Sequence, residues 1–381
     1  MPFAVKSWVQ YGNDEIYPSF ETFIYYSVKH IALIITLLTS QANGQRLAVF
    51  YDEFKHFRVF DDGKFYQLEH LGVKDFGAGG NYVAYVDAMD NFKIYFNGNT
   101  HTLQTLPPRS FKASDYALYY RTEDELKMFS NGEIVGIEKW SEPSTAFGDS
   151  ILAYSDRNGY FKVFSQGKVT ELEVWEVTSY KASDNLLAWV NHTGVFKIFW
   201  HGKTYETEIY PPVQYHLGMN TVAWVNTSNE LRIFHRGIIT DVPGFKPKSF
   251  TAGDDLAAWE SDMGIFSIFY RGEIREISRI APLSYFVKDN ILVYINEREY
   301  FNVYYKGKML LQENYKPPSG FRVDMNVVTY KAIDGRLKAF YNGKNIDVSD
   351  GIISWYQLEG NVILFKEGEN EVKVFYDGQR F

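Results

Sequence analysis

Cysteine is absent from the 381-residue chain, so the sequence excludes disulfide bonds and every metal site built on thiolates. The 8 histidines are dispersed without the spacing of metal ligands. Lysine and arginine occur singly along a chain of net charge −8, without the clustered basic footprint of a nucleic-acid-binding protein. We therefore expect no metal and no nucleic acid among the ligands.

Catalytic and cofactor-binding signatures are missing as well. The chain contains no G-x-S-x-G, no H-E-x-x-H and no P-loop, and the glycine-rich run "FGAGGN" (76–81) lies in a repeat turn. Carboxylates are abundant but recur in turns, so no pair stands out as a catalytic acid and base. The sequence leaves enzymatic activity undecided, favours a binding role, and indicates no cofactor.

Long apolar runs are absent except for one near the N-terminus. Basic residues precede an apolar run over 31–38, and small and polar residues follow it. This order is typical of a secretory signal peptide, with Ala42 and Gly44 at the −3 and −1 positions of the cleavage site and Gln45 as the first mature residue. The alternative is a buried helix or strand at the start of a domain. Because a membrane-spanning helix needs roughly 20 residues, we expect export to the periplasm or beyond the cell, without a transmembrane span in the mature chain.

Two segments follow from this interpretation. Residues 1–44 comprise an upstream extension plus the signal peptide, with translation suspected to start at Val28. Residues 45–381 form one repeat domain. Its composition suits a large core, because 45% of the chain is hydrophobic and 18% is aromatic.

One pattern recurs throughout the repeat domain: an aromatic-rich strand followed by a turn that ends in glycine, as in "FKIYFNGN" (92–99) and "FKIFWHGK" (196–203). Successive copies are spaced by 34 to 36 residues. The marker glycines are Gly63, Gly98, Gly132, Gly167, Gly202, Gly237, Gly272, Gly307, Gly343 and Gly378. Ten copies at so regular a spacing indicate a repeat architecture.

Each unit contains four short segments with the character of strands. In one unit they are "SYKAS" (179–183), "LLAWV" (186–190), "VFKIFW" (195–200) and "KTYETE" (203–208). The dipeptide His201-Gly202 between the last two predicts a tight hairpin turn with two positive φ angles. Four antiparallel strands in tandem units predict an all-β fold, the β-propeller; an open β-solenoid is a weaker alternative, because its parallel strands need no hairpins.

The number of blades is less certain than the architecture. Ten central hairpins are present, but the first unit lacks its innermost strand and the last lacks most of its outer strand. Two rings of five blades would need a seam, and none is visible near residue 210. We therefore favour one ring of about ten blades.

The unit "SYKASDNLLAWVNHTGVFKIFWHGKTYETE" (179–208) resembles the repeats of TolB-like and WD40-like propellers. In those families a short strand, an Asp-containing turn, an Ala-aromatic strand and an Ile-aromatic strand follow in the same order. The turn aspartates here are Asp115, Asp149, Asp184, Asp254 and Asp289. The proline and glycine of the family's Ser-Pro-Asp-Gly turn are missing, and the unit is shorter. The resemblance implies the architecture and not an activity.

A lysine, Lys197, stands in the middle of the third strand of this unit. Counting back from the turn places it opposite Glu206 of the fourth strand, where opposite charges stabilise a strand pair by about 0.2–1 kcal/mol. The same count gives the pairs Lys162–Glu171, Arg232–Asp241 and Lys338–Asp347.

An aromatic residue precedes the position of Lys197 by eight residues in every unit: Phe50, Tyr85, Tyr119, Tyr154, Trp189, Trp224, Trp259, Tyr294, Tyr330 and Phe365. We expect these rings to lie opposite the cations, with a cation–π contact and the lysine stem packed on the ring. This interpretation makes the lysines part of blade packing. The alternative is a basic stripe that binds an anionic polymer.

Large apolar residues recur just after the outer strand of each unit, at Leu71, Leu106, Trp140, Trp175, Tyr210, Phe245, Ile280 and Tyr315. We expect them to seal the gaps between adjacent blades. The alternative is an exposed apolar rim that grips a ligand. On that alternative the candidate binding residues are Trp140, Trp175, Tyr210, Phe245 and Tyr315.

These patterns favour an exported, non-enzymatic propeller that acts as a protein-binding scaffold. A protein partner is expected, and a complex in the outer membrane or periplasm is a candidate for it. The first alternative is a propeller that binds or cleaves carbohydrate, which would gather exposed aromatics and carboxylates on one face. The second is a structural or surface-layer component, which would self-associate.

Overall fold

The computed structural model describes residues 46–139, 145–244, 246–368 and 371–381. Within these ranges the regular structure consists of strands and contains no helix, which confirms the expected all-β class. The predicted signal peptide, together with Trp140 and Phe245, lies outside the described residues. No helix that could cross a membrane is found in the described ranges.

The strands form nine hydrogen-bonded sheets, and the seven-stranded last sheet comprises two blades, so there are ten successive blades, here called blades 1 to 10. Blades 1 to 3 comprise β1 (Leu47–Tyr51), β2 (Phe57–Asp61), β3 (Lys64–Glu69); β4 (Asp75–Ala78), β5 (Tyr82–Val86), β6 (Phe92–Phe96), β7 (Asn99–Gln104); and β8 (Ser110–Ala113), β9 (Leu118–Arg121), β10 (Glu125–Ser130), β11 (Glu133–Lys139). Blades 4 to 6 comprise β12 (Thr145–Phe147), β13 (Ile151–Ser155), β14 (Phe161–Ser165), β15 (Lys168–Glu173); β16 (Ser179–Ser183), β17 (Leu186–Val190), β18 (Phe196–Trp200), β19 (Lys203–Glu208); and β20 (Gln214–Leu217), β21 (Thr221–Val225), β22 (Leu231–His235), β23 (Ile238–Asp241).

Blades 7 and 8 comprise β24 (Pro247–Ala252), β25 (Leu256–Ser261), β26 (Phe266–Tyr270), β27 (Glu273–Ser278); and β28 (Ser284–Lys288), β29 (Ile291–Ile295), β30 (Phe301–Tyr305), β31 (Lys308–Glu313). Blades 9 and 10 share a long strand and comprise β32 (Phe321–Asp324), β33 (Val327–Lys331), β34 (Arg336–Tyr341), β35 (Lys344–Glu359), β36 (Val362–Glu367), β37 (Lys373–Tyr376) and β38 (Gln379–Arg380). The first part of β35 pairs with β34 and the second part with β36, so β35 is the outer strand of blade 9 and the inner strand of blade 10.

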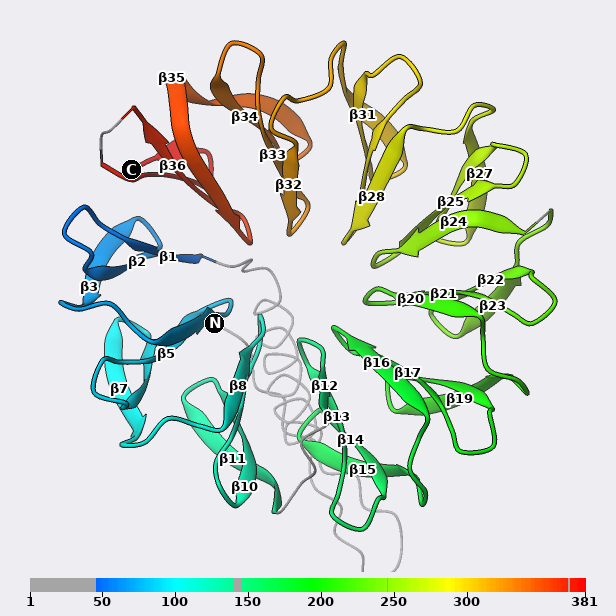
Figure 1. Cartoon of the computed structure of the whole chain (residues 1–381), viewed down its shortest axis with the longest axis horizontal. Coiled ribbons are helices and arrows are strands. Elements are labelled where there is room, and N and C mark those ends of the chain that lie inside the picture. Colours follow the sequence, from blue (N-terminus) through cyan, green and yellow to red (C-terminus); the bar gives the residue numbers. More distant parts are fainter. Residues whose placement is uncertain (1–45, 140–144, 245, 369–370) are drawn as a thin grey trace, which may run out of the picture. The chain divides into compact units, whose positions relative to one another are not determined.

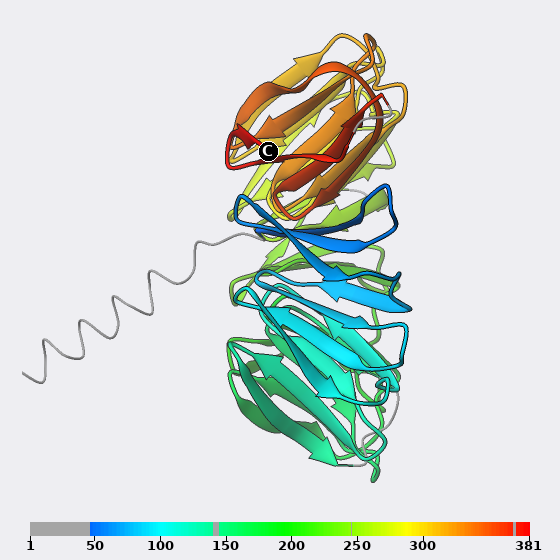
Figure 2. The same ribbon diagram turned by 90° about the vertical axis from the view of Figure 1, so that its left-hand side faces the viewer.

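All ten blades are arranged around one axis (Figure 1). In blades 2 to 10 the first strand lies inside and the fourth outside, whereas the three strands of blade 1 correspond to the second, third and fourth strands of the others. Seen from the side, the sheets pack face to face (Figure 2). The first and last blades are neighbours, because Ala48, Phe50 and Phe60 pack with Val362, Leu364 and Val374. The N–H of Val49 also donates to the Glu359 carboxylate of blade 10 at 3.0 Å. One ring of ten, rather than two rings of five, is therefore the arrangement.

The core lies between blades, on both faces of each sheet. Alternate residues of β17 point to opposite neighbours: Leu186 and Ala188 pack against blade 6, whereas Leu187 and Trp189 pack against blade 4. This two-sided burial explains why the second strand of each unit reads as an unbroken apolar run rather than as an alternation. A single unit would expose both faces, so each blade depends on its neighbours.

Two kinds of turn explain the polar residues of the repeat. Between the second and third strands, an Asx residue such as Asn191 accepts backbone N–H bonds from Thr193 and Val195 at 3.0 and 2.9 Å. Between the third and fourth strands, both residues of each X-Gly pair have positive φ, as at His201 (47°) and Gly202 (77°). The predicted hairpin turns are therefore confirmed.

Lys197 lies opposite Trp189 and Glu206, as the register predicted. Its Nζ contacts Glu206 at 3.1 Å and, equally closely, Glu173 of the preceding blade. Glu173 also accepts the indole N–H of Trp189 at 3.0 Å. Burial lowers the pKa of Lys197, but the two carboxylates outweigh it and raise the pKa overall.

This arrangement, which we call the inter-blade triad, occurs at five of the blade junctions in the described part of the chain. A glutamate at the end of one blade accepts hydrogen bonds from an aromatic OH or NH and a cation of the next blade. The triads are Glu69–Tyr85–Lys93, Glu138–Tyr154–Lys162, Glu173–Trp189–Lys197, Glu208–Trp224–Arg232 and Glu313–Tyr330–Lys338. The lysines are thus blade-packing residues, but their shared partner belongs to the neighbouring blade, which the sequence count missed.

Two details of the predicted packing are wrong. Lys127 lies opposite Tyr120 and not Tyr119, because the preceding turn is one residue shorter in blade 3. The cation–π contact expected for the repeated lysines is replaced by carboxylates. Within the described ranges, the cations that lie over rings occupy other positions, such as Lys181 over Tyr215 at 4.4 Å.

Candidate functional site

The up-and-down order of the strands gives the ring two distinct faces. Turns between the first and second strands, and between the third and fourth, lie on one face, which we call the turn face. Turns between the second and third strands, and the links from blade to blade, lie on the opposite face, which we call the connection face. The candidate binding residues that the structure describes, Trp175, Tyr210 and Tyr315, belong to the connection face.

Large apolar side chains of the connection face are exposed to solvent. Members of this set that are more than half exposed are Phe54, Leu71, Met89, Leu106, Val174, Trp175, Ile209, Tyr210, Val213, Met263, Ile280, Leu283 and Ile333. Single exposed apolar residues are normal on a protein surface, but their repetition on one face is not required by the core. The connection face is therefore the first candidate for an interaction surface.

The structure overturns the expectation that the residues after each outer strand seal the gaps between blades. Trp175 and Tyr210 are 62% and 61% exposed, and Leu71, Leu106 and Ile280 are also mostly exposed. Tyr315 is partly buried. Binding through Trp175, Tyr210 and Tyr315 remains a prediction.

Trp175 lies in an open depression of about 770 Å³ between blades 4 and 5. Its ring approaches the His192 ring, with centroids 6.1 Å apart. Arg157, Tyr160 and Glu176 line the same depression. An exposed indole flanked by a cation, an imidazole and a carboxylate could stack on an apolar or aromatic surface while forming directional polar contacts at its margin.

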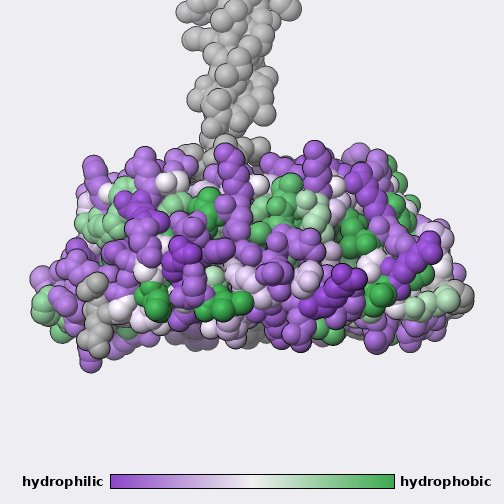
Figure 3. Space-filling view, turned by 90° about the horizontal axis from the view of Figure 1, so that it is seen from above, coloured by the Kyte–Doolittle hydropathy of each residue, from purple (hydrophilic) through white to green (hydrophobic). Residues whose placement is uncertain are grey.

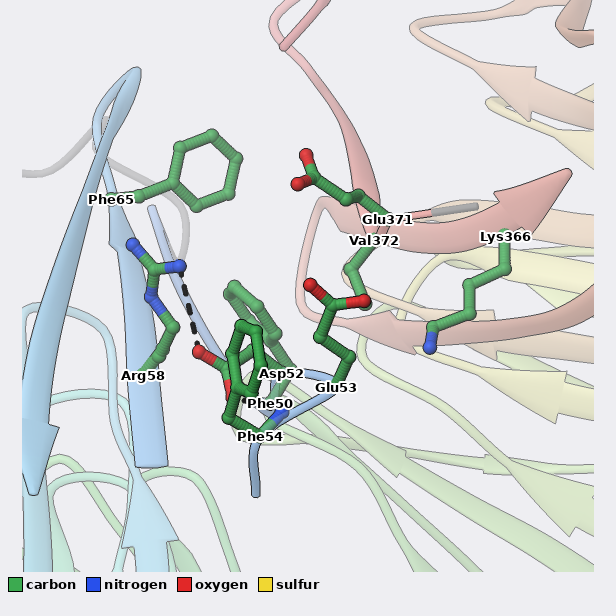
Figure 4. Close-up of a pocket in the computed structure, with 9 residues that line it drawn as sticks. All are labelled: Phe50, Asp52, Glu53, Phe54, Arg58, Phe65, Lys366, Glu371 and Val372. Atoms are coloured by element: carbon green, nitrogen blue, oxygen red, sulfur yellow. Dashed lines mark hydrogen bonds and ion pairs between the residues drawn. The ribbon is translucent and has the colours of Figure 1, made fainter. Parts of the chain in front are cut away.

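A second pocket of about 280 Å³ lies at the junction of blades 1 and 10. Aromatic side chains line it together with charges of both signs (Figure 4). The Arg58 guanidinium contacts Asp52 at 3.7 Å, but its buried Nε has no partner. Lys366 and Glu371 approach from blade 10. Sequence reasoning missed this pocket, because its two walls lie about 300 residues apart in the chain.

The outer strands add scattered apolar side chains to the wall of the ring. Ile274, Met309 and Leu310 are each about two-fifths exposed. Figure 3 shows the wall from above, where apolar side chains are interspersed among polar ones without a continuous apolar band. The side of the wall that Figure 3 shows therefore does not resemble an obligate interface.

Carboxylates gather around the axis at the turn face, in the inner turns between the first and second strands. Burial, and the charge of Asp149 in the next blade, raise the pKa of Asp115 to about 7. Charges of Asp324 and Asp289, from blades 9 and 8 across the axis, raise it further. Burial and the adjacent Asp149 carboxyl also raise the pKa of Asp184.

The inner turns are joined by hydrogen bonds between blades, and we call this ring of turns the collar. The N–H of Asn220 donates to the Asp254 carbonyl at 3.1 Å, and the N–H of Asp254 donates to the Asp289 carbonyl at 2.7 Å. The Asp254 carboxylate accepts from the N–H of Met219 at 3.2 Å. These aspartates therefore hold adjacent blades together. Within the described ranges, no group of three or more acidic or histidine side chains is arranged to bind a metal.

Comparison with known proteins identifies a family for this arrangement. The model of a family described as "10-bladed beta propeller domain" matches residues 41–381. No curated protein sequence matches the chain.

Similar solved structures show low identity and low structural agreement. The computationally designed Ika8 protein is 14% identical with a TM-score of 0.33, covering 80% of this chain and 96% of that one. The CRINKLY WD40 ectodomain of the Arabidopsis thaliana receptor kinase ACR4 is 11% identical with a TM-score of 0.34, covering 62% and 99%. Prp20p from Saccharomyces cerevisiae is 10% identical with a TM-score of 0.31, covering 54% and 76%. At these scores the similarities support no inference about function.

Proposed function

Because the chain belongs to the family of ten-bladed β-propeller domains, we propose that it is a protein-binding scaffold that docks a partner on its connection face. The observation that carries this proposal is the repeated exposure of large apolar side chains on that face, with Trp175 and Tyr210 more than half exposed. Aromatic residues of this kind contribute most of the binding energy at protein interfaces.

The fold supports a scaffold for a second reason. Both faces of each blade are buried against neighbours, so the loops project from a rigid body and lose little conformational freedom on binding. The expected partner is a protein that presents a complementary apolar surface wide enough to contact several blades.

Export belongs to the same proposal. The apolar run over 31–38, preceded by basic residues and followed by small ones, supports secretion to the periplasm or the cell exterior. A partner in an outer-membrane or periplasmic complex would fit such a location. N-terminal sequencing of the natural protein should find Gln45 at or near the start; a first residue upstream of Ile31 would contradict export.

Partner capture with matched variants tests the docking face. A variant that combines Leu106→Ser, Trp175→Ser and Tyr210→Ser should lose the proteins that co-purify from membrane extracts of the native organism. A control that combines Ile134→Ser, Val135→Ser and Val169→Ser changes apolar residues of the outer strands and should retain them. Equal capture by wild type and the connection-face variant would contradict the proposal.

The Trp175 depression favours one other candidate function, the binding of carbohydrate. An exposed indole beside Glu176, Asn158 and His192 offers a stacking surface with polar groups at its edge. Binding on a glycan array that Trp175→Ala abolishes would favour this function. A sugar that raises the melting temperature, with no protein captured, would replace the scaffold proposal.

A further inference from the structure

The outer turns, between the third and fourth strands, differ in charge around the ring. Every one has an X-Gly pair, and the X residue has nearly the same φ in all ten blades, between 46° and 52°. In blades 5 to 8 the X residue is basic: His201, Arg236, Arg271 and Lys306. In the other blades it is Asp62, Asn97, Asn131, Gln166, Asn342 or Asp377. The backbone is the same, so it does not explain the basic residues.

Positive φ makes this choice unfavourable for the backbone. Asn, Asp and His adopt the left-handed region several times more readily than other residues that have a Cβ atom. Five of the six remaining blades follow this preference with Asn or Asp, and blade 5 follows it with His201. Blades 6 to 8 keep Arg or Lys against it. A function of the side chains themselves is the simplest reason for their retention.

Contacts join the basic turns of blades 6 to 8 into one surface. Asp255 contacts Arg236 at 3.1 Å and Arg271 at 3.4 Å, which brings the guanidinium groups of blades 6 and 7 together. Arg275 of blade 7 donates to the Gly307 carbonyl at 3.2 Å, beside Lys306 in blade 8. We call this surface, together with the turn residue His201 of the adjacent blade 5, the basic arc, and define it as His201, Arg236, Arg271, Arg275, Lys306 and Lys308.

The basic arc carries an excess of positive charge. Asp255 is nearly buried and supplies one negative charge to two arginines whose side chains are 52% and 59% exposed. Arg271 and Lys306 also lie over the Tyr270 and Tyr305 rings, at 5.4 and 5.0 Å from their centroids, which restrains the cations. Lys306 and Lys308 are exposed, and neither forms an ion pair with a described carboxylate. Arg275 has a carboxylate partner of its own, Glu273.

Apolar side chains alternate with these cations. Ile238 is 69% exposed immediately after the Arg236-Gly237 turn, and Ile274 and Met309 occupy the neighbouring outer strands. A ligand with uniform negative charge would leave these side chains without contacts. A protein segment with apolar residues between its carboxylates would match both features, because complementary charges steer and orient the partner while apolar contacts add affinity.

We propose that the basic arc binds an acidic segment of a protein partner, in which apolar residues stand between the carboxylates. This inference deepens the proposed scaffold function and rests on it. It adds a second surface on the turn face, opposite the apolar connection face. The chain would then hold two elements at once, one on each face of the ring.

Fluorescence anisotropy with a labelled synthetic peptide of alternating glutamate and leucine tests the proposal on the full chain. We expect saturable binding that weakens with added salt, and weaker binding of the matched peptide of glutamine and leucine. A variant combining Arg275→Gln, Lys306→Asn and Lys308→Gln avoids the Asp255 cluster and should bind about tenfold or more weakly. A second variant, Arg236→Asn with Arg271→Asn, should do the same.

The chain supplies a matched control. Lys64, Lys168 and Lys344 directly follow the turn glycine in blades 1, 4 and 9, as Lys308 does in blade 8. Replacing all three by glutamine removes the same charge elsewhere on the turn face and should leave peptide affinity within about twofold. Equal loss in this control would overturn the proposal, as would undetectable peptide binding. Tighter binding to vesicles of anionic lipid or to DNA than to the peptide would overturn it as well.

The same variants separate the basic arc from the connection face. The Leu106→Ser, Trp175→Ser and Tyr210→Ser variant should keep full affinity for the acidic peptide. If that variant loses its captured partner while the arc variants lose nothing, the scaffold stands and the basic arc fails. If the arc variants lose the captured partner and the connection-face variant keeps it, the partner docks on the turn face and the proposed docking on the connection face is wrong.

Discussion

The inner and outer turns of the turn face show opposite constraints on their residues. In the collar, a Cβ atom at Gly218 would lie 1.8 Å from the Gly253 carbonyl oxygen, and one at Gly148 would lie 2.5 Å from that of Asp184. In the outer turns, a Cβ atom at Gly98, Gly202 or Gly272 would meet nothing within 4 Å. Adjacent blades therefore touch at the axis and diverge at the wall.

This difference helps to distinguish residues that packing requires from residues that serve a function. Near the axis, neighbouring backbones decide which side chains fit, so glycine and short hydrogen-bonding residues recur there. At the outer turns the nearest neighbours are side chains rather than backbone, as at Gly237 and Gly307, so packing restricts the residue choice less than it does in the collar. The cations of blades 6 to 8 occur in this less constrained zone, which is why their consecutive positions carry functional information and the repeated lysines of the triads do not.

A substitution at Gly218, in the collar, should cause the largest loss of stability. Gly218→Ala should destabilise the protein by about 3 kcal/mol or more, because the new methyl group overlaps the backbone carbonyl of Gly253 in the adjacent blade. Thermal denaturation should show a lower melting temperature. Gly72→Ala is the control, since its Cβ atom would meet only Tyr51, at 3.9 Å. A Gly218→Ala protein as stable as the control would refute the constraint at the axis.

The two carboxylates around Lys197 give the next largest contrast. Glu173 is 10% exposed and accepts from both Lys197 and Trp189, whereas Glu206 is 71% exposed and contacts only the lysine. Glu173→Ala should cost about 1–3 kcal/mol, because it leaves the indole N–H without its acceptor and removes a contact between blades. Glu206→Ala should cost less than about 1 kcal/mol. Urea denaturation measures both, and equal losses would contradict the inter-blade role.

The fold was largely predictable because a single period organises it. The regular glycine spacing predicted the hairpins, and the aromatic and charged positions predicted the register of Lys197 with Trp189 and Glu206, since pairing within a hairpin is local. Glu173 was not found, because the count from a turn covers only one blade. The exposure of Trp175 was also misjudged, because repetition alone does not distinguish a seal between blades from a rim.

The candidate surfaces were less predictable, because they depend on contacts between blades. The basic residues of blades 5 to 8 are spaced about 35 residues apart in the sequence, so they read as isolated charges. The ring brings them together through Asp255 and Gly307. Aligning the ten units and comparing only the residue before each turn glycine would have revealed them.

Acidity provides a third comparison, between two adjacent aspartates. Burial and the charge of Asp289 raise the pKa of Asp254 to about 7. Burial would also raise the pKa of Asp255, but His235 and Arg236 outweigh it and lower this pKa to about 2. The contribution of Asp254 to stability is present at low pH and is lost as pH rises through about 7. That of Asp255 is present above its ordinary pKa and is lost as pH falls toward about 2.

We therefore expect the greatest stability at mildly acidic pH, with a loss on the order of 1 kcal/mol or more between pH 6 and pH 8. Melting temperatures across this range measure it. Asp254→Asn keeps an acceptor for the Met219 N–H and should reduce the loss at alkaline pH. A melting temperature that rises from pH 6 to pH 8 would contradict the charge repulsion around the axis.

The smallest expected change in the free energy of unfolding comes from a substitution in an outer turn. Lys306→Asn introduces the residue that blades 2, 3 and 9 use at the same φ, while it removes a cation that lies over the Tyr305 ring. These effects oppose each other, so the free energy of unfolding should change by less than about 1 kcal/mol. Urea denaturation should therefore find Lys306→Asn no less stable than the Asn97→Lys variant of blade 2, which introduces the cation without the contacts of the basic arc. A marked loss of stability in Lys306→Asn would show that the lysine is a structural residue. The contrast between the collar and the outer turns would then no longer support a function for the basic arc.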